Sequence, residues 1–275
     1  CDIEVIDAHG CKAVPGFIDV HVHITGGGGE QGPASRVPEA QLSQFISSGV
    51  TTCVGLLGTD GITRSLPNLL AKCRALNEEG ITCLMLTGSY RYPSATLTRD
   101  VVTDICYIPE CIGAKLAISD HRSSDITYDE FVRLATEVRS GGLLSGKAGI
   151  LHMHTGTGAR MLELVLRAAK NTDIPIKTFY PTHLARSEEL ISQAAEFAKM
   201  GGMIDLTAND PATSAKPACA GIARCIDAGA PAENITLSSD SFGSLPRFDA
   251  AGNCVGLTYV LPDVLLKTVK SCISN

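Results

Sequence analysis

Two histidines separated by one residue are the strongest chemical signal in the sequence. His21 and His23 stand at the end of the run Phe17–His23, whose β-branched residues predict a strand. Because successive side chains on a strand alternate between its two faces, both imidazoles project to one side and can bind one metal ion. An isolated His-x-His pair is more often a hydrogen-bonded pair in a core, so the metal interpretation depends on further ligands.

Metal-binding groups recur near the ends of four other predicted strands: Lys115, His154, His183 and Asp240. Lys115 stands between apolar neighbours, so its burial is costly unless an acid pairs with it or its chemistry changes. Desolvation lowers the pKa of an amine. The free amine could then react with carbon dioxide and form a carbamate that bridges two cations.

The fifth predicted strand offers two candidate ligands. His152 and His154 are two residues apart and face the same way, so the sequence leaves a choice between them. We favour His154 because it lies nearer the strand end before Gly156, whereas His152 would lie one layer deeper. Nitrogen ligands with a carboxylate and no cysteine favour zinc in a hydrolytic site, where the cation lowers the pKa of bound water. Asp240 can accept a proton from this bound water and pass it to the leaving group. Alternatively, it can cap the N-terminus of a helix.

Eight β-branched runs must position these groups: Phe17–His23, Thr51–Gly58, Ile81–Ser89, Ile112–Ser119, Gly149–His154, Phe179–His183, Met203–Thr207 and Ile235–Asp240. Helical periodicity follows each of them: Glu39–Ser48, Ser65–Asn77, Thr98–Ile108, Tyr128–Gly141, Ala159–Lys170, Glu188–Lys199, Cys219–Ala228 and Pro262–Ser271. Eight such units predict an α/β protein closed as a (β/α)8 TIM barrel, with the site at the carboxyl ends of the strands. The alternative, a doubly wound open sheet, fits poorly because Gly26–Gly29 is followed by Glu30 and Pro33 rather than by a helix.

Length and composition limit the remaining possibilities. The chain has 275 residues, of which 44% are hydrophobic, and one barrel of about 250 residues would use nearly all of it. We expect residues 1–16 to be the end of a flanking β-sandwich. Residues 17–275 would then be the catalytic barrel, truncated after its last helix.

Charge and cysteine usage point to a small-molecule substrate and a reducing compartment. The formal net charge is -6 and the chain has no basic stripe, so nucleic acid and anionic membrane are not expected partners. No apolar run approaches the roughly 20 residues that span a bilayer. The eleven cysteines show no paired C-x-x-C spacing, which indicates reduced, packed thiols in a cytoplasmic protein.

The ligand pattern resembles the amidohydrolase superfamily. Asp19, His21 and His23 form an Asp-x-His-x-His motif, and a lysine, two histidines and an aspartate follow in order on later strands. Several stretches resemble the isoaspartyl (β-aspartyl) dipeptidase family within it: PGFIDVHVH from residue 15, GGGGEQGP from 26, LGTD from 57, SYRYPS from 89, KLAISDHR from 115, PTHLAR from 181 and LSSDSFGS from 237.

The resemblance implies two zinc ions bridged by N6-carboxylated Lys115. His21 and His23 would hold one ion, His154 and His183 the other, and Asp240 would be the remaining ligand and the acid/base.

It also implies roles for residues outside the metal ligands. Glu30 would bind the free α-amino group of the substrate, and Tyr90 would polarise the scissile carbonyl. Arg122 and Arg186 would pair with substrate carboxylates. Three residues would complete the aspartyl pocket: Gly28, Thr59 and Ser244.

These roles together imply a metal-dependent dipeptidase in which a metal-bridging hydroxide attacks the β-aspartyl isopeptide bond. A β-aspartyl dipeptide carries one ammonium and two carboxylates, which one acid and two guanidinium groups match. A homo-oligomer is also expected. The alternatives are a dihydroorotase-like or hydantoinase-like enzyme acting on a cyclic amide, which would not need Glu30, and a non-enzymatic barrel protein.

Overall fold

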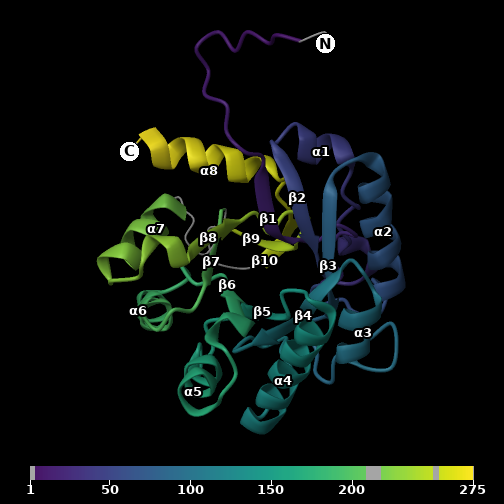
Figure 1. The fold of residues 1–275 in the computed structure, drawn as a ribbon, viewed down its shortest axis with the longest axis vertical. Coiled ribbons are helices and arrows are strands. Elements are labelled where there is room, and N and C mark those ends of the chain that lie inside the picture. The colour runs from purple at the N-terminus through teal and green to yellow at the C-terminus, as the bar shows by residue number, and fades with distance from the viewer. Residues whose placement is uncertain (1–3, 209–217, 250–253, 275) are drawn as a thin grey trace.

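All eight predicted runs form strands in the computed structural model, which describes residues 4–208, 218–249 and 254–274. The strands are β1 (Phe17–Val22), β2 (Val50–Gly55), β3 (Thr82–Gly88), β4 (Cys111–Ile118), β5 (Ile150–Thr155), β6 (Phe179–Thr182), β7 (Ile204–Thr207) and β8 (Ile235–Ser238). The first six form a curled parallel sheet in sequence order, and β7 and β8 form a second parallel pair (Figure 1). The predicted parallel α/β architecture is therefore confirmed.

The two sheets meet at both of their edges. At one edge, Val22 bridges to Ser241 in parallel, and the backbone N–H of His23 donates to the Ser241 carbonyl at 3.0 Å. At the other edge, the backbone N–H of Leu184 donates to the Asp205 carbonyl at 3.4 Å. These contacts bring the carboxyl ends of β1, β6 and β8 to one rim.

Within the described residues, eight α-helices surround the strands, close to the predicted ranges: α1 (Leu42–Ile46), α2 (Leu66–Glu79), α3 (Val101–Tyr107), α4 (Tyr128–Ser145), α5 (Glu163–Asn171), α6 (Glu188–Lys199), α7 (Ala218–Asp227) and α8 (Asp263–Ser274). α3 begins later than predicted because Asp100 caps it, accepting from the Thr103 N–H at 2.8 Å. α4 continues past Gly141, where a Cβ would lie 2.9 Å from the Ile105 Cβ. Gly141 therefore permits close packing of α4 on α3, and Gly146, with φ 67°, ends the helix.

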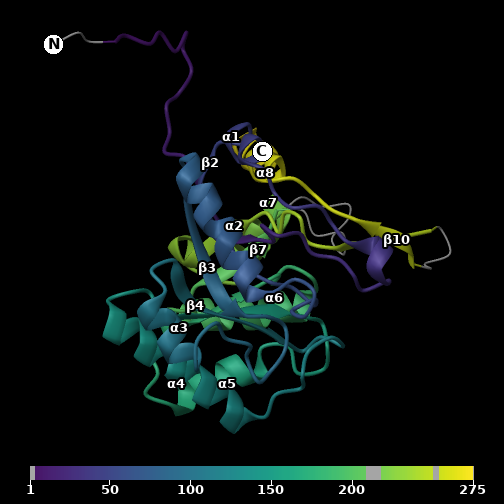
Figure 2. The same cartoon turned by 90° about the vertical axis from the view of Figure 1, so that its right-hand side faces the viewer.

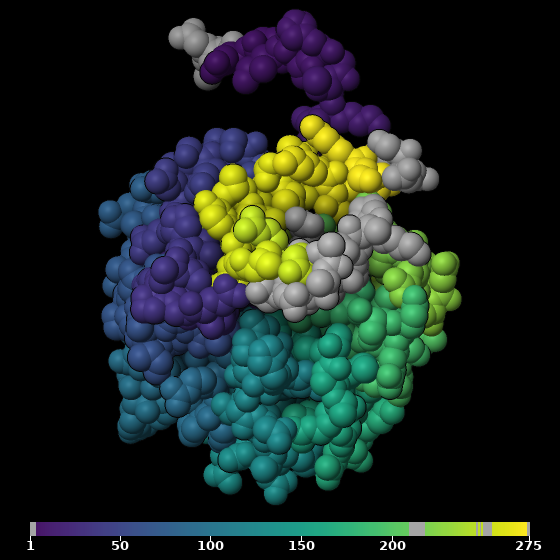
Figure 3. All heavy atoms as spheres, turned by 180° about the vertical axis from the view of Figure 1, so that it is seen from behind, coloured from purple at the N-terminus to yellow at the C-terminus, as the bar shows by residue number. Residues whose placement is uncertain are grey.

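A β-hairpin follows β8 that the sequence analysis did not predict. β9 (Leu245–Phe248) and β10 (Cys254–Thr258) pair antiparallel and project from the body (Figure 2). At the base of the hairpin, the backbone N–H of Phe242 donates to the Val260 carbonyl at 3.0 Å. The hairpin lies beside the segment that follows β1 (Figure 3), and residues 257–259 line a cavity of about 390 Å³ together with residues 34–37.

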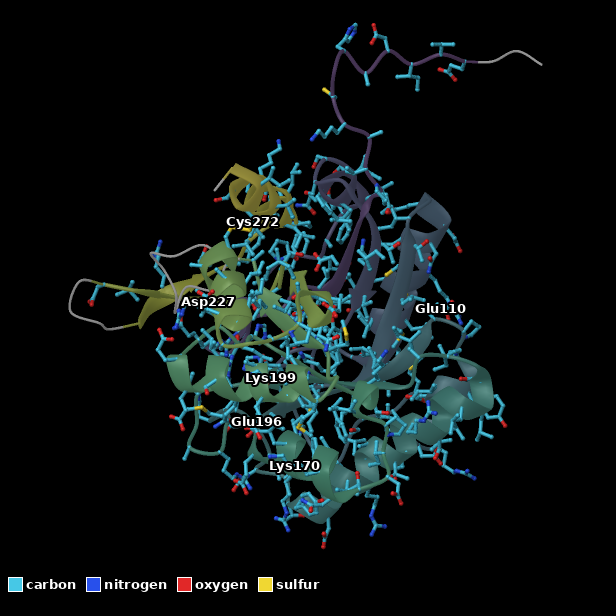
Figure 4. All side chains as sticks on the ribbon, turned by 60° about the vertical axis from the view of Figure 1, so that its left-hand side comes forward. Glu110, Lys170, Glu196, Lys199, Asp227 and Cys272 are labelled. Atoms are coloured by element: carbon cyan, nitrogen blue, oxygen red, sulfur yellow. A yellow bond between two sulfur atoms is a disulfide. The ribbon has the colours of Figure 1, made fainter. Side chains whose placement is uncertain are left out.

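One pair of cysteines departs from the prediction of reduced thiols. Cys219 on α7 and Cys272 on α8 form a disulfide, with their Cα atoms 5.3 Å apart (Cys272 is labelled in Figure 4). The two residues are 53 positions apart, so only helix packing brings them together. Cys53 and Cys73, among others, are free and buried as expected.

The segment before β1 runs away from the body (Figures 1 and 2). Its described residues 4–16 form no strand, and Val5 and Ile6 are 85% and 82% exposed. That this segment ends a flanking β-sandwich stays a prediction. Among the helices of the described ranges, none combines the length and apolarity that crossing a membrane requires.

Candidate metal centre and substrate pocket

Three predicted ligands converge at the rim where β1, β6 and β8 end. Ligand atoms of His21, His183 and Asp240 all lie within 4.8 Å of one another, and all three residues are buried. His23 joins them, with its Nε2 atom 3.1 Å from Asp240 Oδ1. The parallel projection predicted for His21 and His23 therefore places both imidazoles against the same carboxylate.

His183 and Asp240 reach this point by leaving strand geometry. Their backbone φ angles are 66° and 51°, in the left-handed region that residues other than glycine rarely adopt. His183 Nδ1 lies 2.5 Å from Thr207 Oγ1, whereas its buried Nε2 atom has no hydrogen-bond partner among the described residues. A buried nitrogen without a partner, facing a carboxylate, fits a site that binds a cation.

A chain of hydrogen bonds fixes the tautomer of His21. His152 Nδ1 donates to the Tyr180 carbonyl at 2.9 Å, so His152 Nε2 must accept from His21 Nδ1 at 2.8 Å. His21 Nε2 is then left without a proton, 3.4 Å from Asp240 Oδ1. His152 thus lies behind His21 and orients it, as the deeper position predicted for His152 requires.

Lys115 is fully buried on β4 and lies against the same cluster. Its Nζ atom is 3.4 Å from His21 Nε2, and in the described part of the chain no carboxylate pairs with it. Burial lowers the pKa of Lys115 to about 7, although the carboxylates of Asp240 and Asp205 act in the opposite direction. A large share of free amine is therefore present near neutral pH.

Burial also keeps four histidines at or beside the centre uncharged. It lowers the pKa values of His21, His152 and His183 well below the ordinary value and that of His154 to about 3. Burial alone would raise the pKa of Asp240, but its hydrogen bond with His23 and the nearby charges lower it. Neutral imidazoles beside an ionised carboxylate are the protonation states that bind a divalent cation.

His154 lies next to this group, but its ring nitrogens have protein partners. Nε2 is 2.9 Å from Asp120 Oδ2, and Nδ1 is 2.6 Å from the Tyr90 hydroxyl. Its ring centroid is 4.6 Å from that of His183. The structure therefore brings His154 beside the other predicted ligands without including it in the three-residue cluster.

Asp120 is a site residue to which the sequence analysis gave no role. Its carboxylate accepts from Arg122 Nε and Nη2, each at 2.8 Å, as well as bonding His154. Burial would raise the pKa of Asp120, but the hydrogen bonds from Arg122 and His154 hold it far below its usual range. Its position two residues after a strand that carries Lys115 was the signal available in the sequence.

The predicted substrate-binding residues form a line of paired charges. Ser244 Oγ donates to Glu30 Oε1 at 2.7 Å, and Glu30 Oε1 lies 3.6 Å from Arg122 Nη1. Arg122 also lies over the Tyr90 ring, 5.2 Å from its centroid. Arg186 Nη1 donates to the Thr155 carbonyl at 3.2 Å and lies 3.4 Å from His154 Nε2.

A cavity of about 340 Å³ opens beside this line. Gly28, Glu30 and Thr59 line it, so three of the predicted substrate residues share one space. The loop that carries Gly28 and Glu30 is anchored by the buried Arg64, which donates to the carbonyls of Thr25 and Val37. The sequence analysis did not identify Arg64, because nothing local marks a guanidinium that binds a distant loop.

Comparisons with known proteins show which family and fold the chain resembles. No protein-family model matches the chain. The crystal structure of beta-aspartyl dipeptidase from the thermophilic, keratin-degrading Fervidobacterium islandicum AW-1, in complex with beta-Asp-Leu dipeptide, is similar at 48% identity. The match covers 94% of this chain and 69% of that chain, with a TM-score of 0.88.

Two further structures extend the comparison. Another beta-aspartyl dipeptidase structure from Fervidobacterium islandicum AW-1 matches at 44% identity over 94% of this chain and 67% of that chain, with a TM-score of 0.84. The 5-methylcytosine deaminase from Klebsiella pneumoniae, liganded with phosphonocytosine, matches at 15% identity over 87% of this chain and 67% of that chain. Its TM-score of 0.53 shows a shared fold alone.

The hydrogen bond between His152 and His21 yields a first prediction. In His152→Phe, His21 Nδ1 loses its acceptor and the ring is free to turn, so we expect affinity for a divalent cation to fall about 10- to 100-fold. Competition with a chelator measures this constant. His9→Ala, which alters an exposed imidazole in the segment before β1, is the control and should bind the cation like the wild type. Equal affinity in His152→Phe and the wild type would contradict the orienting role.

Proposed function

Since the chain belongs to the beta-aspartyl dipeptidase family, we propose that it hydrolyses the isopeptide bond of β-aspartyl dipeptides. The observation that carries the proposal is the buried cluster of His21, His183 and Asp240 beside the charged line from Glu30 to Arg122. A hydrolytic centre and groups that complement a small zwitterion thus lie at one rim.

The proposed architecture is one closed (β/α)8 barrel. Contacts of β8 with β1 and of β6 with β7 support closure of the eight strands. We keep residues 1–16 as a flanking β-sandwich segment and residues 17–275 as the catalytic barrel. A cytoplasmic homo-oligomer stays a prediction.

The proposed cofactor is a pair of zinc ions. His21 and His23 would hold one ion and His154 and His183 the other, with N6-carboxylated Lys115 as the bridge and Asp240 as the remaining ligand. When bound, the ions would lower the pKa of a shared water and so activate it for attack near neutral pH. His154 Nε2–H would donate its hydrogen bond to Asp120. The unprotonated Nδ1 atom of His154 would then be the one that coordinates the ion.

Tyr90 would stabilise the oxyanion, and Asp240 would transfer the proton. Burial raises the pKa of Tyr90, so its hydroxyl stays protonated and can donate to the scissile carbonyl oxygen. That hydroxyl now bonds His154 Nδ1, so it would change partner when His154 coordinates metal. Asp240 would accept the proton of the attacking water and pass it to the leaving amino group.

The charged groups of the substrate would replace ion pairs that the protein's own side chains form in this structure. Its α-ammonium would take the place of Arg122 at Glu30, and its carboxylates would bind Arg122 and Arg186. Gly28, Thr59 and Ser244 would enclose the aspartyl group, as the shared cavity at Gly28 and Thr59 supports.

Zinc loading tests the cofactor. We expect about two zinc ions per chain by elemental analysis after zinc and bicarbonate are supplied, and hydrolysis of β-Asp-Leu only then. Protonation of Lys115 prevents carbamate formation, so loading should decline as the pH falls below the Lys115 pKa of about 7. Absence of bound zinc together with absence of hydrolysis would favour a non-enzymatic barrel.

Glu30 separates the proposed substrate from a cyclic amide. Glu30→Gln removes the charge that would bind the α-ammonium, so kcat/KM for β-Asp-Leu should fall about 30- to 100-fold, the effect of roughly 2–3 kcal/mol. Glu39→Gln, at an exposed acid of a nearby loop, is the matched control and should retain wild-type kinetics. Unchanged kcat/KM in Glu30→Gln, with turnover of dihydroorotate, would favour the cyclic-amide alternative.

Tyr90→Phe tests the oxyanion role. Loss of a donor aimed at developing charge costs about a hundredfold to a thousandfold in kcat, so we expect a fall of that size with zinc content unchanged. Tyr92→Phe, two residues further along the same loop, should leave kcat near the wild-type value. If the two variants have the same kcat, Tyr90 does not stabilise the oxyanion.

A further inference from the structure

The hydrogen-bonded sheet is interrupted between β6 and β7, next to the metal centre. The six-stranded sheet ends at β6, and β7 pairs with β8 instead. Within the described residues, a 3.4 Å hydrogen bond from Leu184 N–H to the Asp205 carbonyl is the backbone link across this seam. His183 and Asp240 lie on opposite sides of the seam, because His183 follows β6 and Asp240 follows β8.

The carboxylate of Asp205 on β7 bridges the seam by hydrogen bonds to residues on β6 and β8. Asp205 is fully buried on β7 and accepts three hydroxyl hydrogen bonds. Thr182 on β6 donates to Oδ2 at 2.5 Å, and on β8 Ser238 donates to Oδ2 at 2.6 Å and Thr236 to Oδ1 at 2.8 Å. A carboxylate can only accept, so it fixes the direction of all three hydroxyls and joins three strands through one group.

The donors lie next to the two ligands in the chain. Thr182 immediately precedes His183, and Ser238 lies two residues before Asp240. Both ligands hold left-handed backbone angles, which persist where the surroundings over-determine them. The hydrogen bonds to Asp205 fix the backbone from which each ligand departs.

We propose that Asp205 is a positioning residue that sets the separation of His183 and Asp240 across the β6–β7 seam and so sets the affinity of the site for its cation. The inference rests on the proposed function, because it concerns the same centre. Among the described residues, the carboxylate of Asp205 bonds Thr182, Ser238 and Thr236 rather than either ligand, so it would act through Thr182 and Ser238.

The test compares Asp205→Asn with a matched buried acid. Asp104 is also fully buried and accepts hydrogen bonds from Thr87, Leu97 and Thr98, but none of these residues stands within two positions of a proposed ligand in the chain. Both variants should unfold at a lower temperature than the wild type. We expect zinc affinity, measured by chelator competition, to fall about 10- to 100-fold in Asp205→Asn and to stay within about twofold in Asp104→Asn.

Recovery by metal gives a second readout. In Asp205→Asn the chemical groups remain, so kcat for β-Asp-Leu should approach the wild-type value when zinc is raised to saturation. If Asp205→Asn does not fold, Ser238→Ala removes one donor and keeps the carboxylate, and a several-fold loss of zinc affinity is expected.

Wild-type zinc affinity in Asp205→Asn, or in Ser238→Ala when that variant is needed, would overturn the inference. An equal loss of affinity in Asp205→Asn and Asp104→Asn would do the same, since it would reflect stability alone. In both cases an active, zinc-binding wild type leaves the proposed function intact. A wild type that neither binds zinc nor hydrolyses β-Asp-Leu would overturn the proposed function, and the inference with it.

Discussion

Imidazoles, an amine and carboxylates are buried together at one rim of the strands, and the contacts around them must compensate for the loss of water. Burial of such groups is tolerated when each is neutral, hydrogen-bonded or opposed by charge. His21, His152, His154 and His183 stay neutral because burial lowers their pKa values. The ring nitrogens of His21 and His183 that face away from the centre bond His152 and Thr207. Ligand atoms of His21, His183 and Asp240 face one another, and this is the donor set to which the proposed cations would bind.

The same need for compensation explains the contacts around the centre. On β7, Asp205 accepts hydrogen bonds from hydroxyl groups on β6 and β8. Outside it, the chain of contacts from Ser244 through Glu30 and Arg122 to Asp120 balances charge without a ligand. Under the proposed function, the ammonium and carboxylates of a dipeptide would separate these pairs and bind their members. The same side chains would then serve both the stability of the ligand-free protein and substrate recognition.

Local patterns in the sequence predicted much of the fold and of the site. The eight strands and eight helices follow from hydrophobic period and from caps such as Gly80, whose φ of 109° requires glycine. The pairing of His21 and His23 follows from the alternation of a strand. The hairpin β9–β10 and the Cys219–Cys272 disulfide were missed, because both depend on partners that lie apart along the chain.

Periodicity and residue chemistry are local properties, so the candidate ligands and the strand ends at which they stand could be predicted from the chain alone. The partner of each group became known from the three-dimensional fold. It placed His152 behind His21, Asp120 on His154 and Arg122, and Asp205 beneath the seam. Those choices depend on which strands become neighbours and on the direction of each hydrogen bond, and neither is encoded in the spacing of residues along one strand.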